Sequence, residues 1–311
     1  MYTRRDVGKI ALGGATLAAF GANSVNATDS VGGVRLGATT WSLRDLPRIP
    51  GQDNINDLIG PLKSAGVTEV DLWSYNTEPA GPNTGPGAPP PPAAYPIRIH
   101  TFSKEEIAAA MLQARNLLRD FRLFHARVNY YQDIRAKFET AGISVTAYTV
   151  RYDDTFTDEE IDVTFQQAKV LGASSITAPG APEVVKRLVP FAEKHQMNVA
   201  LTDFTLASAL PSKRFKVNAD IGAITAANGS PVAWIQENHD AISQIVIKDR
   251  RRNNGQNEQY GDGDTPIRDV LRLVREKTYT CPVFAEYEYL GLGTPAEELQ
   301  RCMDYVRSAL A

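Results

Sequence analysis

The sequence predicts an α/β protein built as a single (β/α)8 TIM barrel, and three observations support this fold class. Short apolar runs alternate with amphipathic stretches of helical spacing, and the alternation repeats eight times over about 280 residues. Such repetition is typical of a closed parallel barrel. No G-x-G-x-x-G follows the first run and no run ends in a phosphate-loop lysine motif, which argues against an open, doubly wound sheet. We expect one barrel domain over residues 31–311.

The first 27 residues have the features of an export signal. Arg4 and Arg5 form a twin arginine, Lys9 follows, and a weakly apolar run leads to small residues ending at Ala27. The run is too short to span about 30 Å of hydrocarbon. We expect a twin-arginine signal peptide over residues 1–27 and a mature protein that is periplasmic in a bacterium, or secreted. No later segment is apolar enough to cross a membrane, so no membrane association is expected after cleavage.

Eight apolar runs are the candidates for the barrel strands. They are short, and amphipathic stretches such as DEEIDVTFQQAKVLG and TPIRDVLRLVREK separate most of them. The runs span residues 34–41, 68–73, 143–150, 174–179, 198–204, 214–220, 243–249 and 282–289. Side chains at the carboxyl ends of barrel strands reach the active-site mouth, so the last residues of each run are the candidates for function.

The interval between the second and third runs breaks this rhythm. It holds about seventy residues and opens with residues 78–96, of which eight of nineteen are proline. Such a segment can neither pair in a sheet nor continue a helix, so we expect a loop of polyproline character on the mouth side of the barrel. A surface insert and a substrate lid are both compatible with it. Helices are expected over FSKEEIAAAMLQARNLLRDF and around YYQDIRAKFETAG.

Composition and charge exclude several functional classes. With 43% hydrophobic and 22% charged residues among 311, the chain can bury a substantial core, and extensive disorder is excluded. Its 33 basic and 36 acidic residues give a formal net charge of -3, too balanced to attract nucleic acid by its bulk field. Cys281 and Cys302 are too few for a four-cysteine zinc site, and we expect them to stay unpaired.

Seven runs of the chain can be compared as a set: LGATTWSLRD, VDLWSYNTEP, DDTFTDEEIDVTFQQAKVLGA, FKVNADIGAITAANG, VIKDRRRNNG, YGDGDTPI and FAEYEY. In their order and spacing they resemble the sugar phosphate isomerase/epimerase family, which has the xylose isomerase-like barrel. The resemblance extends from about Val34 to Leu310. It implies a carbohydrate substrate and one divalent cation at the barrel mouth, which polarises a carbonyl while a base removes the neighbouring proton.

The resemblance also implies metal ligands at strand ends in the second half of the barrel, and two carboxylates match them. Asp220 matches the aspartate that ends the sixth strand, and Glu286 matches the glutamate that ends the eighth. At five other positions a histidine or glutamate of the family's pattern is replaced; these are Asn76, Thr202, Phe204, Ala223 and Val246. All four histidines of the chain fall away from the expected strand ends, and we interpret each as a surface or packing residue.

Two interpretations of this site stay open. In the first, Asp220, Glu286 and neighbouring oxygen ligands hold one divalent cation, which would be manganese, magnesium or calcium. In the second no cation binds, and the two carboxylates pair with Lys248, the inward-facing cation expected beside them. In both, Asp220, Glu286 and Lys248 converge at the carboxyl end of the barrel, with Lys248 and Glu286 as the catalytic residues.

Further residues near strand ends indicate how a carbohydrate would bind. Trp41 and Trp73 end the first two runs, where flat aromatic faces can stack on a sugar ring or plug the core. Asn218 is expected to contact the substrate. Arg250 is the first of three arginines after the seventh run, which would hold an anionic substrate or lie in a solvated loop. Export argues against phosphorylated sugars and favours a free sugar or glycoside derivative.

Two functional classes remain. The first is a sugar isomerase or epimerase that abstracts a proton next to a carbonyl, a chemistry that also serves lyases and hydrolases of oxidised sugars. The second is a catalytically degenerate barrel that binds a carbohydrate or a partner protein without turnover. The family resemblance favours the first class, and the replaced histidines favour the second. The sequence leaves the oligomeric state open, a homo-oligomer included.

Overall fold

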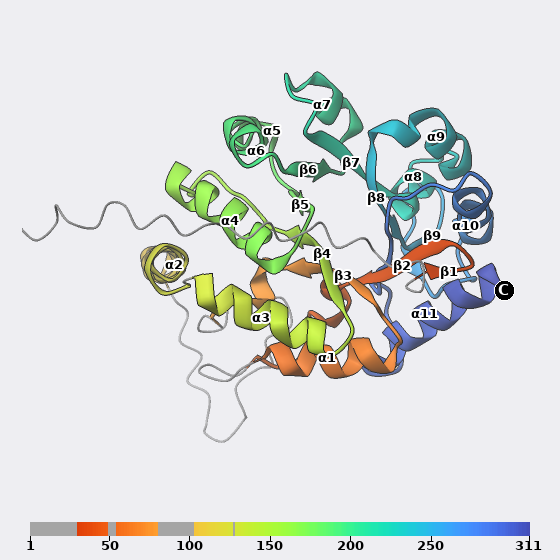
Figure 1. Cartoon of the computed structure of the whole chain (residues 1–311), viewed down its shortest axis with the longest axis horizontal. Coiled ribbons are helices and arrows are strands. Elements are labelled where there is room, and N and C mark those ends of the chain that lie inside the picture. The colour runs from red at the N-terminus through yellow and green to blue at the C-terminus, as the bar shows by residue number, and fades with distance from the viewer. Residues whose placement is uncertain (1–29, 49–53, 80–102, 127) are drawn as a thin grey trace, which may run out of the picture.

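The structure, a computed structural model, describes residues 30–48, 54–79, 103–126 and 128–311. These residues form a closed barrel of eight parallel strands with helices around it, which confirms the predicted TIM barrel (Figure 1). The expected signal peptide and most of the proline-rich insert lie outside the described residues. Within the described ranges, no helix combines the length and the apolar character needed to cross a membrane.

The barrel strands coincide with the eight apolar runs. Each strand begins within one residue of its expected start, but most end earlier than expected. The strands are β2 (Val34–Thr39), β3 (Glu69–Trp73), β4 (Ser144–Thr149), β5 (Ser175–Thr177), β6 (Asn198–Leu201), β7 (Phe215–Asp220), β8 (Ile242–Ile247) and β11 (Val283–Ala285). Successive strands pair in parallel, and β2 closes the barrel by pairing with both β3 and β11. Several residues expected at strand ends therefore lie on the loops just beyond.

In the described part of the chain, three short strands lie outside the barrel itself. β1 (Ser30–Val31) pairs antiparallel with the start of β2. β9 (Asp249–Arg250) and β10 (Asn257–Glu258) form a small antiparallel hairpin after β8.

The seam where the barrel closes depends on Gly37 of β2. A Cβ atom at this position would lie 2.3 Å from the carbonyl oxygen of Glu69 and 2.8 Å from the ring of Phe284. No side chain fits between backbone and ring at that spacing, so the close approach of β2 to its neighbours requires glycine. Arg35 of β2 reinforces the seam through two hydrogen bonds to the Glu69 carboxylate, of 2.5 and 2.8 Å.

Helices follow the strands and cover the outer face of the barrel, with most of the buried apolar side chains between them and the sheet. They are α1 (Ile55–Ser64), α2 (Lys104–Asp120), α3 (Val128–Thr140), α4 (Asp158–Leu171), α5 (Pro182–Lys186), α6 (Val189–His195), α7 (Phe204–Ala209), α8 (Ile221–Ala226), α9 (Pro231–Asn238), α10 (Ile267–Glu276) and α11 (Pro295–Leu310). Capping boxes begin α2, α4 and α11. Cys281 and Cys302 are both free thiols.

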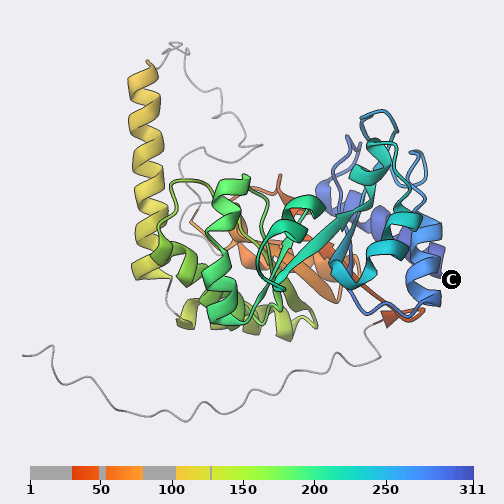
Figure 2. The same cartoon turned by 90° about the horizontal axis from the view of Figure 1, so that it is seen from above.

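Helix α2 is attached differently from the other long helices. None of its residues is buried, and Figure 2 shows it standing at the side of the barrel and projecting past it. Arg115 and Arg119 of α2 contact the fully buried carboxylate of Glu160 on α4, at 2.6 and 3.3 Å. Arg122, in the π-helical turn η5 (Phe121–His125), contacts the same carboxylate at 3.2 Å. Charge, rather than apolar packing, therefore holds α2 to the barrel.

Candidate functional site

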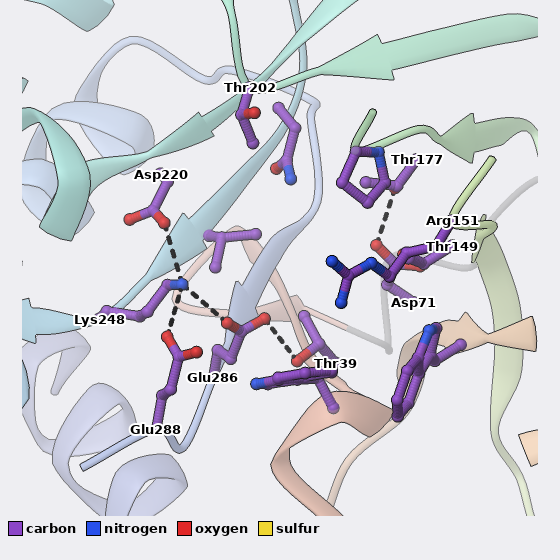
Figure 3. Close-up of a pocket in the computed structure, with 15 residues that line it drawn as sticks. Thr39, Asp71, Thr149, Arg151, Thr177, Thr202, Asp220, Lys248, Glu286 and Glu288 are labelled. Carbon is purple, nitrogen blue, oxygen red and sulfur yellow. Dashed lines mark hydrogen bonds and ion pairs between the residues drawn. The ribbon is translucent and has the colours of Figure 1, made fainter. Parts of the chain in front are cut away.

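A cavity of about 220 Å³ opens at the carboxyl ends of the barrel strands (Figure 3). Every one of the eight strands, or the residues directly after it, contributes to its wall. The lining residues are Thr39, Trp41, Asp71, Trp73, Thr149, Arg151, Thr177, Pro179, Thr202, Asn218, Asp220, Val246, Lys248, Glu286 and Glu288. Six of the seven site residues predicted from the sequence are among them, and Arg250 is not.

One wall of the cavity is an ion cluster centred on Lys248. Its ammonium nitrogen lies 3.1 Å from the carboxylate of Asp220, 2.9 Å from that of Glu286 and 2.8 Å from that of Glu288. Figure 3 shows the three carboxylates around this nitrogen, Asp220 at the end of β7 and Glu286 and Glu288 in the segment after β11. None of the four side chains is more than 29% exposed. The predicted convergence of Asp220, Glu286 and Lys248 is therefore present, and Glu288 joins it.

Local structure orients each carboxylate toward Lys248. Asp220 ends β7 and caps α8, so that one of its oxygens accepts the Ala223 N–H at 2.9 Å and the other faces the ammonium. Gly222 makes room for the lysine, because a Cβ atom there would lie 2.8 Å from the Cβ of Lys248. Glu286 follows β11, and its second oxygen accepts the hydroxyl of Thr39 at 2.9 Å.

The single positive charge of Lys248 faces three carboxylates, and it affects their pKa values unequally. Burial lowers the pKa of Lys248, but the facing carboxylates outweigh burial and raise it above its ordinary value, so the lysine stays protonated. Burial raises the pKa of Glu286 above its ordinary value, even with Lys248 alongside. Burial also raises the pKa of Glu288, but Lys248 outweighs that effect and the net change is a lower value. Glu286 therefore takes up a proton more readily than Glu288.

The residues of this cluster do not fit a divalent cation. Where the three carboxylates converge, the ammonium of Lys248 already supplies the positive charge. Over the part of the chain that the structure describes, no cluster of three or more His, Cys, Asp or Glu side chains could hold a metal ion. Two of the histidines are engaged elsewhere, His195 with Asp162 and His239 stacked on Tyr279. The geometry corresponds to the interpretation in which the carboxylates pair with Lys248.

The opposite wall is built around Asp71, which the sequence analysis missed. This carboxylate lies within β3 and is 2% exposed. It accepts the hydroxyl of Thr149 at 2.7 Å, the hydroxyl of Thr177 at 2.8 Å and the side-chain amide of Gln244 at 2.9 Å. Burial raises the pKa of Asp71 above its ordinary value, although these hydrogen bonds act in the opposite direction. An acidic residue at an inward position of an apolar strand is the signal that could have identified it.

Arg151 is another lining residue that the sequence patterns did not indicate. It lies two residues beyond the end of β4, and Figure 3 shows its guanidinium pointing into the cavity. Its side chain makes no hydrogen bond or ion pair with any described residue. Among the described residues it has no charged partner, whereas Lys248 is surrounded by carboxylates.

Aromatic side chains form a third part of the wall. The rings of Trp41 and Trp73 meet edge to face at 4.7 Å, and Tyr75 stacks on Trp73 at 4.5 Å. Trp41 lies in the 3₁₀ turn η3 (Thr40–Leu43) rather than on the strand, and Trp73 is 7% exposed. Both rings line the cavity and also pack against one another, so they belong to the core and face the space that a ligand would occupy.

The replaced family positions have different fates. Thr202 and Val246 line the cavity, and Asn76 is buried where its amide oxygen accepts the Thr40 hydroxyl at 2.7 Å. Phe204 and Ala223 lie on helices α7 and α8. The guanidinium of Arg250 donates to the carbonyl oxygen of Gly255 in the loop of the β9–β10 hairpin, at 2.8 and 3.2 Å. The expectation that Arg250 binds substrate therefore has no geometric support, because its charged group is used within that loop.

Comparison with known proteins places the fold in a class. No family model matches the chain, and no curated protein matches it. A xylose isomerase domain protein from Alicyclobacillus acidocaldarius superposes with a TM-score of 0.56 at 14% identity, covering 88% of this chain and 98% of that one. A 3-keto-D-glucoside 4-epimerase from E. coli superposes with a TM-score of 0.56 at 12% identity, covering 88% and 99%. The IolI protein, solved with a bound zinc atom, has a TM-score of 0.56 at 11% identity, covering 88% and 97%.

These likenesses define the class of fold. The chain has the xylose isomerase-like TIM barrel fold, as the resemblance of its sequence implied. At identities of 11 to 14%, the comparisons establish architecture and leave the chemistry to the residues of the cavity.

Proposed function

We propose that the protein is an isomerase- or epimerase-type enzyme that acts on a carbohydrate by removing a proton next to a carbonyl. The observation that carries this proposal is the position of Glu286, a buried carboxyl group held between Lys248 and Thr39 at the wall of the cavity. A base with a raised pKa accepts a carbon-bound proton more readily than an ordinary glutamate does. A solved structure of the same fold belongs to a sugar epimerase, which supports the carbohydrate part of the proposal.

The step assigned to this chain is a proton transfer. The proton on the carbon beside the carbonyl passes to Glu286, and the electron pair moves onto the carbonyl oxygen to give an enediolate. The ammonium of Lys248 keeps positive charge beside that developing negative charge. Trp41 and Trp73 offer apolar faces to the sugar ring. The buried amide oxygen of Asn218 has no hydrogen-bond partner among the described residues and accepts from a substrate hydroxyl.

The second candidate function is a barrel that binds a carbohydrate without turnover. One observation favours it: the ammonium of Lys248 faces three carboxylates, which leaves it few hydrogen atoms to offer to a substrate oxyanion. In that case the ion cluster is a structural replacement for a catalytic centre. The cavity would still recognise a ligand through its aromatic and polar wall.

Deuterium exchange separates the two functions. The protein would be incubated in D₂O with a panel of aldoses, ketoses and keto-glycosides, and the loss of the proton beside the carbonyl followed by NMR. We expect exchange with at least one compound, abolished by Glu286→Gln and retained after treatment with EDTA. Glu183→Gln, at a glutamate of α5 whose side chain is 81% exposed, is the control. Binding without exchange would instead support the non-catalytic barrel.

A further inference from the structure

The hydroxyl groups of the cavity wall have a fixed hydrogen-bond polarity. Thr149 and Thr177 each donate their single hydroxyl hydrogen to Asp71, and Thr39 donates its own to Glu286. A threonine hydroxyl has one hydrogen and two lone pairs, so these three groups can only accept hydrogen bonds from a ligand. Thr202 makes no hydrogen bond to any described residue, and its hydroxyl stays free to turn.

Asp71 fixes this polarity on its wall. Its two oxygens accept from three donors at 2.7, 2.8 and 2.9 Å, and the carboxylate is 2% exposed. Because a buried carboxylate must keep such donors, turning either threonine toward a ligand would leave the charge poorly compensated. Gln244 also fixes the orientation of the Thr177 hydroxyl, because its side-chain amide donates to the Thr177 oxygen at 3.1 Å.

The charged groups of the wall also favour a ligand that donates hydrogen bonds and carries no negative charge. Four carboxyl groups line the cavity, namely those of Asp71, Asp220, Glu286 and Glu288, against the two cationic groups of Lys248 and Arg151. Lys248 is already engaged by three of the carboxylates. The amide oxygen of Asn218 adds a buried acceptor that no described residue satisfies. The wall therefore offers mostly acceptors and an excess of negative charge.

We infer that the cavity selects a polyhydroxy ligand without an anionic group, whose hydroxyls bind as donors, and that Asp71 is the positioning residue that holds Thr149 and Thr177 as acceptors. Neutral sugars and amino sugars meet this requirement. Sugar acids and sugar phosphates carry further hydrogen-bond acceptors and negative charge, which the acceptor-rich, negatively charged wall repels. The inference rests on the proposed carbohydrate function and names the substrate class of the same site.

Among the described residues that line the cavity, Arg151 is the one that could favour an anionic ligand. It is an exposed cation without a described protein partner, and its guanidinium points into the cavity. A carboxylate or phosphate would find its counter-ion there. We expect this single exposed charge to be outweighed by the carboxylates, because an exposed ion pair contributes little binding free energy.

A matched ligand panel tests the selection. Calorimetry would compare methyl glycosides, 2-amino sugars, uronates and hexose 6-phosphates in the gluco, galacto and manno configurations. We expect methyl glycosides and amino sugars to bind at least about tenfold more tightly than the anionic sugars of the same configuration. A tenfold difference in affinity corresponds to about 1.4 kcal/mol of binding free energy. Tighter binding of a uronate or a sugar phosphate than of the neutral sugar, lost in Arg151→Ala, would overturn this inference. It would not contradict the proposed carbohydrate function. Failure of every compound to bind would overturn the proposed function as well.

Fluorinated and deoxygenated sugars test the role of Asp71. Fluorine accepts a hydrogen bond weakly and cannot donate one, so at a position read by an acceptor the deoxyfluoro and deoxy analogues should bind equally poorly. Each should be about three- to tenfold weaker than the parent glycoside. Asp71→Asn releases a threonine hydroxyl to donate, and the deoxyfluoro analogue should then bind better than the deoxy analogue. Asp154→Asn, at an exposed aspartate, should leave the two analogues equal.

A second pair of variants covers the case in which Asp71→Asn does not fold. Thr149→Val and Thr177→Val each remove one acceptor while keeping the shape of the side chain. Each should weaken methyl glycoside binding while sparing the deoxy analogue at the matching hydroxyl. Unchanged selectivity in both folded variants would contradict the assignment of these hydroxyls as acceptors.

Discussion

At the scale of single residues, Lys248 decides what the cavity can do. Glu286 and Asp220 match ligand positions in the family that the sequence resembles, yet a protein ammonium lies between them and Glu288. Breaking a buried ion pair from one side is costly because the remaining charges lose their compensation. Lys248 therefore maintains the electrostatic balance of the whole cluster.

Replacing Lys248 with methionine should make the fold strongly pH-dependent. Three partly buried carboxylates would lose their common counter-ion, and we expect a loss of about 3 to 5 kcal/mol in the free energy of unfolding near pH 8. Without the ammonium the folded carboxylates have raised pKa values, so the folded state binds more protons than the unfolded chain. Stability of the variant should therefore fall as the pH rises through those values, and the deficit should shrink at pH 5.

Urea titration at several pH values measures this deficit. Lys186→Met is the control, because that ammonium is 57% exposed and pairs with an exposed glutamate of its own helix, Glu183. It should change stability by about 0.5 kcal/mol or less. A Lys248→Met protein as stable as the wild type at pH 8 would show that the cluster does not depend on the ammonium.

At the scale of elements, the sequence predicted the scaffold better than the polar wall. Apolar runs predicted the eight strands because each must bury its side chains on both faces. Strand ends were less well defined: β11 stops at Ala285, and Glu286 and Glu288 lie beyond it. Asp71 was missed because its role depends on Thr149 and Thr177, which come from other strands, and no local pattern brings those three side chains together.

Asp249 is another residue whose role only the structure reveals. Its carboxylate accepts the backbone N–H groups of Gly261, Gly263 and Thr265 at 2.7, 3.0 and 3.1 Å. A Cβ atom at Gly263 would lie 2.1 Å from this carboxylate, so the glycine is needed for the contact. Asp249 thus organises the loop after β10, whereas its neighbour Lys248 faces the cavity.

Helix α2 provides the prediction at this scale. Burial raises the pKa of Glu160, but hydrogen bonds and charge from the arginines outweigh it and lower the pKa to about 2 from an ordinary 4.5. Glu160→Gln should cost about 3 kcal/mol near neutral pH and should speed amide hydrogen exchange over residues 104–120. Because the native pKa is lowered, the advantage of the wild type should be complete above pH 4.5 and disappear as the pH falls toward 2.

The comparison for this helix uses Glu139. Its carboxylate pairs with Arg135 on the surface of α3 and is 50% exposed, so Glu139→Gln should leave exchange in α2 unchanged. Equal exchange over residues 104–120 in wild type and Glu160→Gln would show that contacts other than this carboxylate hold the helix.

At the scale of the whole molecule, the fold and the chemistry are separately determined. The barrel depends on strand periodicity and on close contacts such as those of Gly37, which many sequences satisfy. This is why structures only 11 to 14% identical superpose over nearly the whole of their own length. The cavity wall depends on a few side chains, and substituting them changes the chemistry while the barrel persists.

We propose that the chain is exported by the twin-arginine route. The route carries proteins that have already folded, and the free thiols of Cys281 and Cys302 mean that the fold described here needs no oxidising compartment. Burial raises the pKa of Cys281 to about 11 and that of Cys302 to about 12, which keeps both thiols protonated and resistant to oxidation.

Replacing Arg4 and Arg5 together with lysine should leave the full-length precursor in the cytoplasm, folded and without the cleavage expected after Ala27. Cell fractionation and mass spectrometry of the N-terminus would measure this outcome, with Lys9→Arg as a control that keeps the twin arginine and the basic charge. Export of the double variant at the wild-type rate would exclude the twin-arginine route. If the wild type and the double variant both stayed in the cytoplasm uncleaved, the basic N-terminus would not be an export signal. The substrate would then have to be sought among cytoplasmic carbohydrates.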